Sequence, residues 1–241
     1  MIPLLLATTP ITPPATAQAT VQVADAANTS TNQQPTDQPE NKWSYPYASI
    51  QAGVGFSSGM NGNINYLGLS TVQNTLGLNT GFNGELAVGY KFPQFRTDLS
   101  VGYSNLGNQT QTVTAPNFAT GSVTGTGSVN LFTVMANLYY DFKIKKKDGN
   151  LSRWSPYIGA GIGWGNLSTP GCALANCNLY QSGNASTFAY QGKVGIAYRA
   201  TQSGFLFLEG GYLGTSAATV QNVSYDPLGV WRVNLGWRQR F

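Results

Sequence analysis

Residues 82–103 read FNGELAVGYKFPQFRTDLSVGY, and this stretch decides the fold. On either side of Pro93-Gln94, most residues of one parity are apolar or aromatic, which is the period of a β-strand. The charged residues all have the opposite parity: Glu85, Lys91, Arg96 and Asp98. The stretch therefore predicts two antiparallel strands joined by a tight turn, with one apolar face and one charged face.

The same period recurs in eight segments of about ten residues, the length that a transmembrane β-strand needs. These segments lie within residues 45–56, 82–92, 95–103, 132–142, 158–164, 188–198, 206–212 and 231–241. The parity opposite to the apolar one carries every charge of the eight strands: Glu85, Lys91, Arg96, Asp98, Asp141, Lys193, Arg199, Glu209, Arg232, Arg238 and Arg240. Periodicity alone leaves open a soluble barrel or sandwich, whose apolar face would be the core.

Two further patterns favour an apolar face that points toward lipid. Aromatic residues gather at both ends of the segments, as in the girdles that mark the two membrane interfaces. Long links alternate with short ones, and the tight turns are Pro93-Gln94 and residues 200–203. Long outside loops and short periplasmic turns are typical of bacterial outer-membrane barrels.

Composition excludes several classes of function. Charged residues make up 9% of the 241 residues, against about 25% in an ordinary soluble domain. No apolar run approaches the roughly 18 residues of a transmembrane helix. The chain has no histidine, which excludes histidine as a catalytic base or metal ligand, and two cysteines cannot build an ordinary zinc site. We expect no catalytic residue, no metal and no cofactor.

Residues 84–92, GELAVGYKF, and 156–163, PYIGAGIG, resemble strands of the eight-stranded outer-membrane barrel family, which includes the opacity proteins and the barrel domain of OmpA. The ending NLGWRQRF, residues 234–241, resembles the assembly signal of such proteins, with Gly236 and Phe241 at its typical positions. Gln239 departs from it, because a large apolar residue is usual there.

This resemblance implies an all-β, eight-stranded antiparallel transmembrane up-and-down β-barrel with long extracellular loops and short periplasmic turns. It places the protein in the outer membrane of a Gram-negative-type bacterium, with both termini in the periplasm. Its partners would be the lipid bilayer and the barrel assembly machinery. The barrel would span residues 43–241, with no residues left for a peptidoglycan-binding domain.

The first 42 residues have a different character. Residues 1–19 end in small residues, ATAQA, and we interpret them as a possible signal peptide, truncated because no Lys or Arg precedes Lys42. Residues 20–42 are polar and are expected to be a disordered periplasmic lead-in.

The inward charges predict an internal network, because the side chains of an eight-stranded barrel fill its interior and buried ions need partners. Its expected members are Glu85, Lys91, Arg96, Asp98, Asp141, Lys193, Arg199, Glu209, Arg232 and Arg238. The network could be a structural plug, or it could line an anion-selective path or ligand pocket. Gly159, Gly161, Gly163 and Gly165 also face inward, and either make room for long side chains from facing strands or leave a narrow water-filled void.

Three predictions concern the connections. Cys172 and Cys177 are expected to form a disulfide in an outside loop. The lysines within residues 143–147 are expected to be solvated on a periplasmic turn. The outside loops, Ser57 to Thr80 and Asn105 to Gly127 among them, are expected to be flexible and polar, with exposed apolar residues at Leu67, Leu69, Leu76, Leu78 and Phe118.

We therefore predict a non-enzymatic, plugged barrel scaffold whose surface loops mediate adhesion, other surface interactions or envelope integrity. The alternative is a narrow channel for small solutes. A barrel hydrolase is disfavoured, because similar barrel enzymes rely on a histidine. An extracellular ligand is a possible partner, and nothing indicates nucleic-acid binding.

Overall fold

The computed structural model describes residues 44–57, 59–66, 70–114, 121–124, 127–144, 152–171, 181–220 and 223–241. The predicted signal peptide and lead-in, as well as Cys172 and Cys177, lie outside these ranges. Within them the chain forms thirteen strands: β1 (Tyr45–Phe56), β2 (Met60–Tyr66), β3 (Ser70–Leu78), β4 (Gly81–Lys91), β5 (Phe95–Thr114), β6 (Gly121–Thr124), β7 (Ser128–Asp141), β8 (Trp154–Thr169), β9 (Gly183–Arg199), β10 (Gly204–Thr215), β11 (Ala218–Val220), β12 (Val223–Tyr225) and β13 (Gly229–Arg240). The described part of the chain holds no helix that is long and apolar enough to cross a bilayer.

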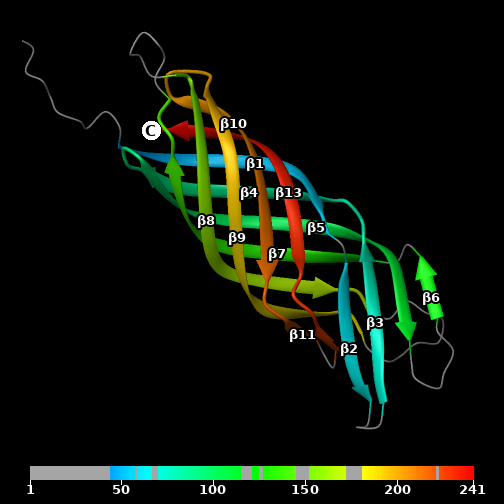
Figure 1. Ribbon diagram of the computed structural model, residues 1–241. Helices are drawn as coiled ribbons and strands as arrows, with labels where there is room; N and C mark the ends of the chain where they lie inside the picture. The colour runs from blue at the N-terminus through cyan, green and yellow to red at the C-terminus, as the bar shows by residue number, and fades with distance from the viewer. Residues whose placement is uncertain are drawn as a thin grey trace, which may run out of the picture. The chain divides into compact units, whose positions relative to one another are not determined.

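Eight of these strands close into a barrel (Figure 1). They are β1, β4, β5, β7, β8, β9, β10 and β13, and each pairs antiparallel with the barrel strand before and after it in the chain. The pairing of β1 with β13, in which Ile50 lies opposite Trp237, joins the first strand to the last. The predicted eight-stranded antiparallel up-and-down barrel is confirmed.

The two faces of the barrel strands differ in exposure. Residues of the apolar parity point outward, and Leu99 and Val88, which pair across β5 and β4, are 61% and 63% exposed. Residues of the other parity point into the lumen, where Arg96 is 3% exposed. The outer surface is therefore an apolar belt, and the barrel carries its charges inside.

Aromatic rings form a rim at each end of this belt. We call the end where Tyr45 and Phe241 lie the terminal end. There the ring centroids of Phe95 and Tyr140 lie 5.4 Å apart, and those of Trp154 and Tyr198 lie 4.7 Å apart. At the opposite end, which we call the loop end, the ring of Tyr212 contacts that of Trp231 at 5.0 Å. The tight turns lie at the terminal end, where Phe92 N–H donates to the Phe95 carbonyl at 2.8 Å.

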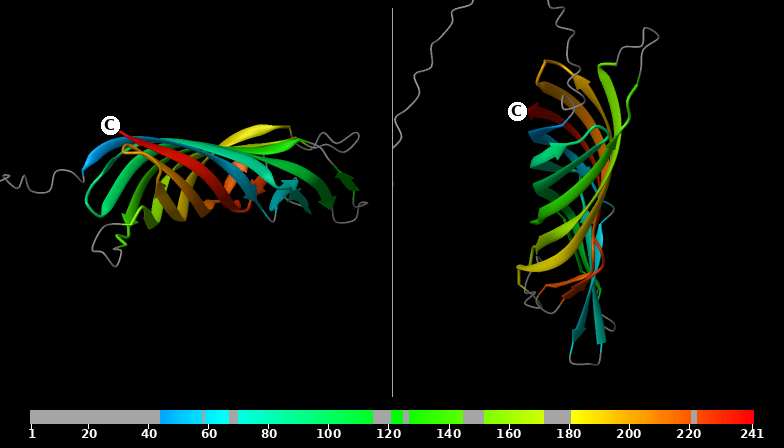
Figure 2. Two further views of the ribbon diagram at one scale, coloured as in Figure 1. Left: turned by 90° about the horizontal axis from the view of Figure 1, so that it is seen from above. Right: turned by 90° about the vertical axis from the view of Figure 1, so that its left-hand side faces the viewer.

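The segments expected to be flexible loops contain strands, which corrects that prediction. β5 continues to Thr114 beyond its barrel pairings, and β2 and β3 form a hairpin within the first predicted loop. β11, β12, β2, β3, the end of β5 and β6 pair in that order, and we call them the loop sheet. In Figures 1 and 2 the β2–β3 hairpin projects past the barrel strands at the loop end.

We expect Leu99→Arg to lower the free energy of unfolding by about 2–4 kcal/mol, because it places a charge on the outer belt near the bilayer midplane. The measurement is denaturant unfolding of the barrel in lipid vesicles. Thr97→Arg, on the same face of β5 but near the rim, is the matched control and should cost about 0–1 kcal/mol. Equal stability of Leu99→Arg and the unaltered protein would mean that this face does not contact lipid.

Candidate functional site

The lumen holds a central ion cluster made of Glu85, Lys193, Glu209 and Arg232, from β4, β9, β10 and β13. Lys193 Nζ lies 2.6 Å from Glu85 Oε1 and 3.2 Å from Glu209 Oε1, and Arg232 Nη1 lies 3.8 Å from Glu85 Oε2. Tyr157 donates its hydroxyl to Glu209 Oε2 at 3.0 Å. Two acids and two bases thus balance, which a buried ion cluster requires.

A second group of charges lies nearer the terminal end. Asp141 pairs with Lys91 and lies 3.6 Å from Arg96 Nη2. Asp98, another predicted member of the network, forms no ion pair among the described residues and instead accepts hydrogen bonds from the hydroxyl of Tyr47 at 2.8 Å and from Asn137 Nδ2 at 2.7 Å. Neutral donors therefore satisfy this carboxylate.

Aromatic rings surround two buried guanidinium groups in the same region. Arg96 Cζ lies 4.1 Å from the centroid of the Tyr139 ring and 4.8 Å from that of Tyr157. Arg238 Cζ lies 5.5 Å from the Tyr47 centroid and 5.7 Å from that of Tyr157. The two arginines thus share rings. These cation–π contacts add to the pairing of Arg96 with Asp141 and surround Arg238, which forms no ion pair among the described residues.

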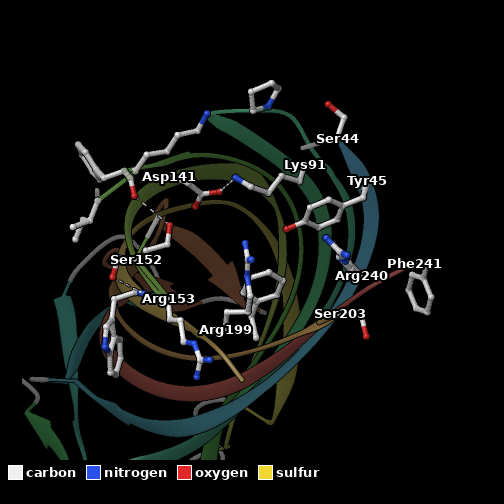
Figure 3. A pocket seen from close by; sticks show the side chains of 17 residues that line it. Ser44, Tyr45, Lys91, Asp141, Ser152, Arg153, Arg199, Ser203, Arg240 and Phe241 are labelled. Carbon is white, nitrogen blue, oxygen red and sulfur yellow. Dashed lines mark hydrogen bonds and ion pairs between the residues drawn. The ribbon is translucent and has the colours of Figure 1, made fainter. Parts of the chain in front are cut away.

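The lumen ends in an open pocket of about 630 Å³ at the terminal end. Figure 3 shows the side chains of Lys91, Arg199 and Arg240 gathered around this mouth. Arg199, a predicted member of the internal network, is exposed here. Its Cζ atom lies 5.7 Å from the centroid of the Phe205 ring, and it forms no ion pair with another described residue. The structure thus brings Arg199 into the pocket and not into the buried clusters.

The loop end of the lumen is filled by an apolar plug that the sequence analysis missed. Barrel strands and loop segments contribute equally to its sixteen buried residues: Met60, Leu76, Leu78, Leu106, Val129, Leu131, Met135, Leu167, Ala189, Leu213, Ala218, Val220, Val223, Tyr225, Leu228 and Val230. Leu76 and Leu78, expected to be exposed, are buried here, whereas Leu67, Leu69 and Phe118 lie outside the described residues. Apolar residues on the inward parity, such as Leu131, Met135 and Leu213, were the available signal.

The polar group in this plug is also satisfied. The hydroxyl of Tyr225 accepts a hydrogen bond from Asn74 Nδ2 at 3.4 Å, and both residues are buried. An ordinary tyrosine hydroxyl is already protonated in neutral solution, and burial raises the pKa of Tyr225 further. The plug is therefore uncharged throughout.

The inward glycines of β8 are packed against side chains of the neighbouring strand β7. A Cβ at Gly159 would collide with the ring of Tyr139, and one at Gly161 would collide with the amide of Asn137. Met135 and Leu131 occupy the corresponding space beside Gly163 and Gly165. The structure thus favours the expectation that these glycines make room for long side chains. Those side chains come from the adjacent strand and not from a facing one.

Gly236 and Phe241, the predicted assembly signal, differ in their surroundings. A Cβ at Gly236 would collide with the ring of Phe207, so this glycine has a packing role of its own. Phe241 is 76% exposed at the terminal end. Among the described residues, no group of acidic, cysteine or histidine side chains is arranged to hold a metal ion.

A closed barrel with an outward apolar belt, aromatic rims and an ionic interior defines an integral outer-membrane barrel protein. The family model described as Surface antigen matches residues 69–228. Since this is more than half of the chain, the protein belongs to the surface antigen family.

Solved barrels are similar to this chain at low identity. The outer membrane protein OprG of Pseudomonas aeruginosa has a TM-score of 0.52 and 13% identity, covering 81% of this chain and 97% of that one. Neisserial surface protein A, NspA, has a TM-score of 0.48 and 18% identity, covering 82% and 97%. The outer membrane protease OmpT of Escherichia coli has a TM-score of 0.45 and 9% identity, covering 82% and 97%. The likeness to OprG shows the fold alone, and no curated protein matches the chain.

We expect Lys193→Met to lower the free energy of unfolding by about 3–5 kcal/mol, because it leaves Glu85 and Glu209 buried with too few cations. Lys193→Met combined with Glu209→Gln should recover most of this loss, since Glu85 then faces Arg232 alone. Denaturant unfolding in vesicles measures both variants. A double variant no more stable than the single one would show that charge balance does not govern this cluster.

Proposed function

We propose that this protein is a non-enzymatic outer-membrane scaffold, closed to solutes, whose loop end mediates contacts at the cell surface. The apolar plug carries this proposal. It occupies the loop end of the lumen with buried Leu, Val and Met side chains, and a continuous water path would have to cross it. It also holds the loop segments against the barrel strands, so the loop sheet is presented by a rigid support.

The proposal includes an orientation. The loop end faces the exterior and both termini lie in the periplasm, which the alternation of long connections with tight turns supports. It also retains a signal peptide in residues 1–19, a lead-in in residues 20–42, a disulfide between Cys172 and Cys177, and recognition of Gly236 and Phe241 by the barrel assembly machinery.

The outer face of the β2–β3 hairpin is the surface we assign to contact. Asn61 lies opposite Thr75, and Asn63 lies opposite Gln73, and all four side chains are exposed. The neighbouring strands add Thr219 and Ser224, also exposed. Hydroxyl and amide groups predominate on this face, and one exposed carboxylate, Asp226, follows beside Asn61, so the face suits hydrogen bonding to a polar partner.

The test measures how many cells attach to surfaces coated with glycoproteins, with matrix proteins or with a layer of the same cells. Cells that display the protein should attach in greater numbers than cells that carry an empty vector. Asn61→Ala, Asn63→Ala, Gln73→Ala and Thr75→Ala together should reduce the number of attached cells at least about tenfold, because several hydrogen bonds are lost at once. An epitope inserted between Asn79 and Thr80, stained on intact cells, confirms display.

The matched control replaces Gln94, Thr201 and Gln202, exposed at the terminal end, by alanine and should leave attachment unchanged. If displaying cells attach no better than vector cells to every surface tested, the surface-contact function is refuted.

The competing channel is tested by single-channel conductance of the refolded protein in a planar bilayer. We expect no discrete current steps, because the apolar plug excludes water. Slower gel migration after boiling, compared with before, confirms that the protein was folded. Reproducible steps would instead favour the narrow channel for small solutes.

A further inference from the structure

The pocket at the terminal end lies at the opposite end of the barrel from the proposed contact surface. Its volume of about 630 Å³ falls within the roughly 300–1,000 Å³ of small-molecule sites. Ends of seven barrel strands and three connections meet here, so residues far apart in the sequence, such as Tyr45, Asp141 and Arg240, line one space (Figure 3). Neither the central ion cluster nor the apolar plug contributes to it.

The lining of this pocket is strongly basic. Among its seventeen described residues are five basic side chains, Lys91, Lys143, Arg153, Arg199 and Arg240, and a single acidic one, Asp141. Asp141 already pairs with Lys91 and lies near Arg96. In the described part of the chain, no carboxylate forms an ion pair with Arg153, Arg199 or Arg240.

More positive charge lies directly behind the lining. Arg238 precedes Arg240 by two residues on the inward face of β13, and it is 3% exposed. Its Nε and Nη2 atoms, like Nε of Arg96, have no hydrogen-bond partner among the described residues. A concave wall with an excess of one charge sign concentrates counter-ions, so the mouth of the lumen attracts anions.

The remaining lining residues indicate which anion fits. Four serines line the pocket: Ser44, Ser152, Ser155 and Ser203. Ser155 donates its hydroxyl to the Phe142 carbonyl at 3.3 Å, and the other three can donate theirs to a ligand. Forked guanidinium groups with hydroxyls match the several acceptor oxygens of a phosphate group better than a single carboxylate. Phe142, Trp154 and Phe205 provide an apolar wall beside these donors.

We propose that this pocket is a binding site for a phosphate-bearing anion, with Arg199 and Arg240 as its principal ligands. The inference is independent of the surface-contact function, and only the compartment, the periplasm, follows from the orientation proposed above. The phosphate could belong to a soluble compound or to the headgroup of a phospholipid, and the two sources need separate probes.

The test is isothermal titration calorimetry of the full chain folded in a maltoside detergent free of phosphate, at low ionic strength. The probes are inorganic pyrophosphate for the soluble source and monomeric dihexanoyl phosphatidic acid for the lipid source. We expect saturable binding of one equivalent per chain, weakened at least about tenfold by Arg199→Gln combined with Arg240→Gln. Binding of both probes or of pyrophosphate alone supports a soluble ligand, and binding of phosphatidic acid alone supports a lipid.

The matched control is Asn79→Asp combined with Gln181→Glu, which lowers the net charge by the same amount at the loop end, where both side chains are exposed. It should bind like the unaltered protein. If the control variant weakened probe binding as much as the arginine variant, the effect would come from net charge alone and the proposed site would be wrong. The proposal would also be wrong if neither probe bound saturably. Gel migration before and after boiling confirms that each variant is folded. If Arg199→Gln combined with Arg240→Gln does not fold, Arg153→Gln, at an exposed position of the same pocket, is expected to weaken binding of the probe instead.

Discussion

Closure of the β-sheet is the constraint on which the rest of this structure depends. Hydrocarbon offers no partner for backbone N–H and C=O groups, so each strand in the bilayer needs a neighbour on both sides. The pairings of β1 with β13 and of β5 with β7 meet this need. In a closed sheet, successive side chains of a strand point alternately to the lipid and to the lumen. The lumen of an eight-stranded barrel is small enough for the inward side chains to fill it.

The filling of the lumen changes along its length. At the loop end it is apolar, and in the middle Glu85, Lys193, Glu209 and Arg232 balance one another. At the terminal end positive charge is in excess and is held by aromatic rings and by a pocket open to water. The lumen is thus packed with apolar side chains at one end and opens into a charged cavity at the other.

The sequence predicts the faces of the strands well, because the period of two is local and is set by neighbours such as Leu86 and Val88. It does not predict which charges meet. Lys193 pairs with Glu85, which lies 108 residues away in the sequence, and Asp98 accepts hydrogen bonds from Tyr47 and Asn137 instead of pairing with a cation. Both sets of partners depend on how the strands are staggered around the barrel. The burial of Leu76 and Leu78 was missed for a similar reason, because it requires the loop strands to pack against inward side chains at the loop end of the barrel.

The β2–β3 hairpin contributes one face to the apolar plug and the other to solvent. Met60 and Leu76 are buried while Asn61 and Thr75 are exposed, so the cost of a substitution alternates from residue to residue. Changes at the buried positions open cavities, and changes at the exposed positions alter only the polar outer face. If immune pressure drives this surface to diversify, variation along the hairpin will fall on every second residue, and its antigenic repertoire is limited to that half.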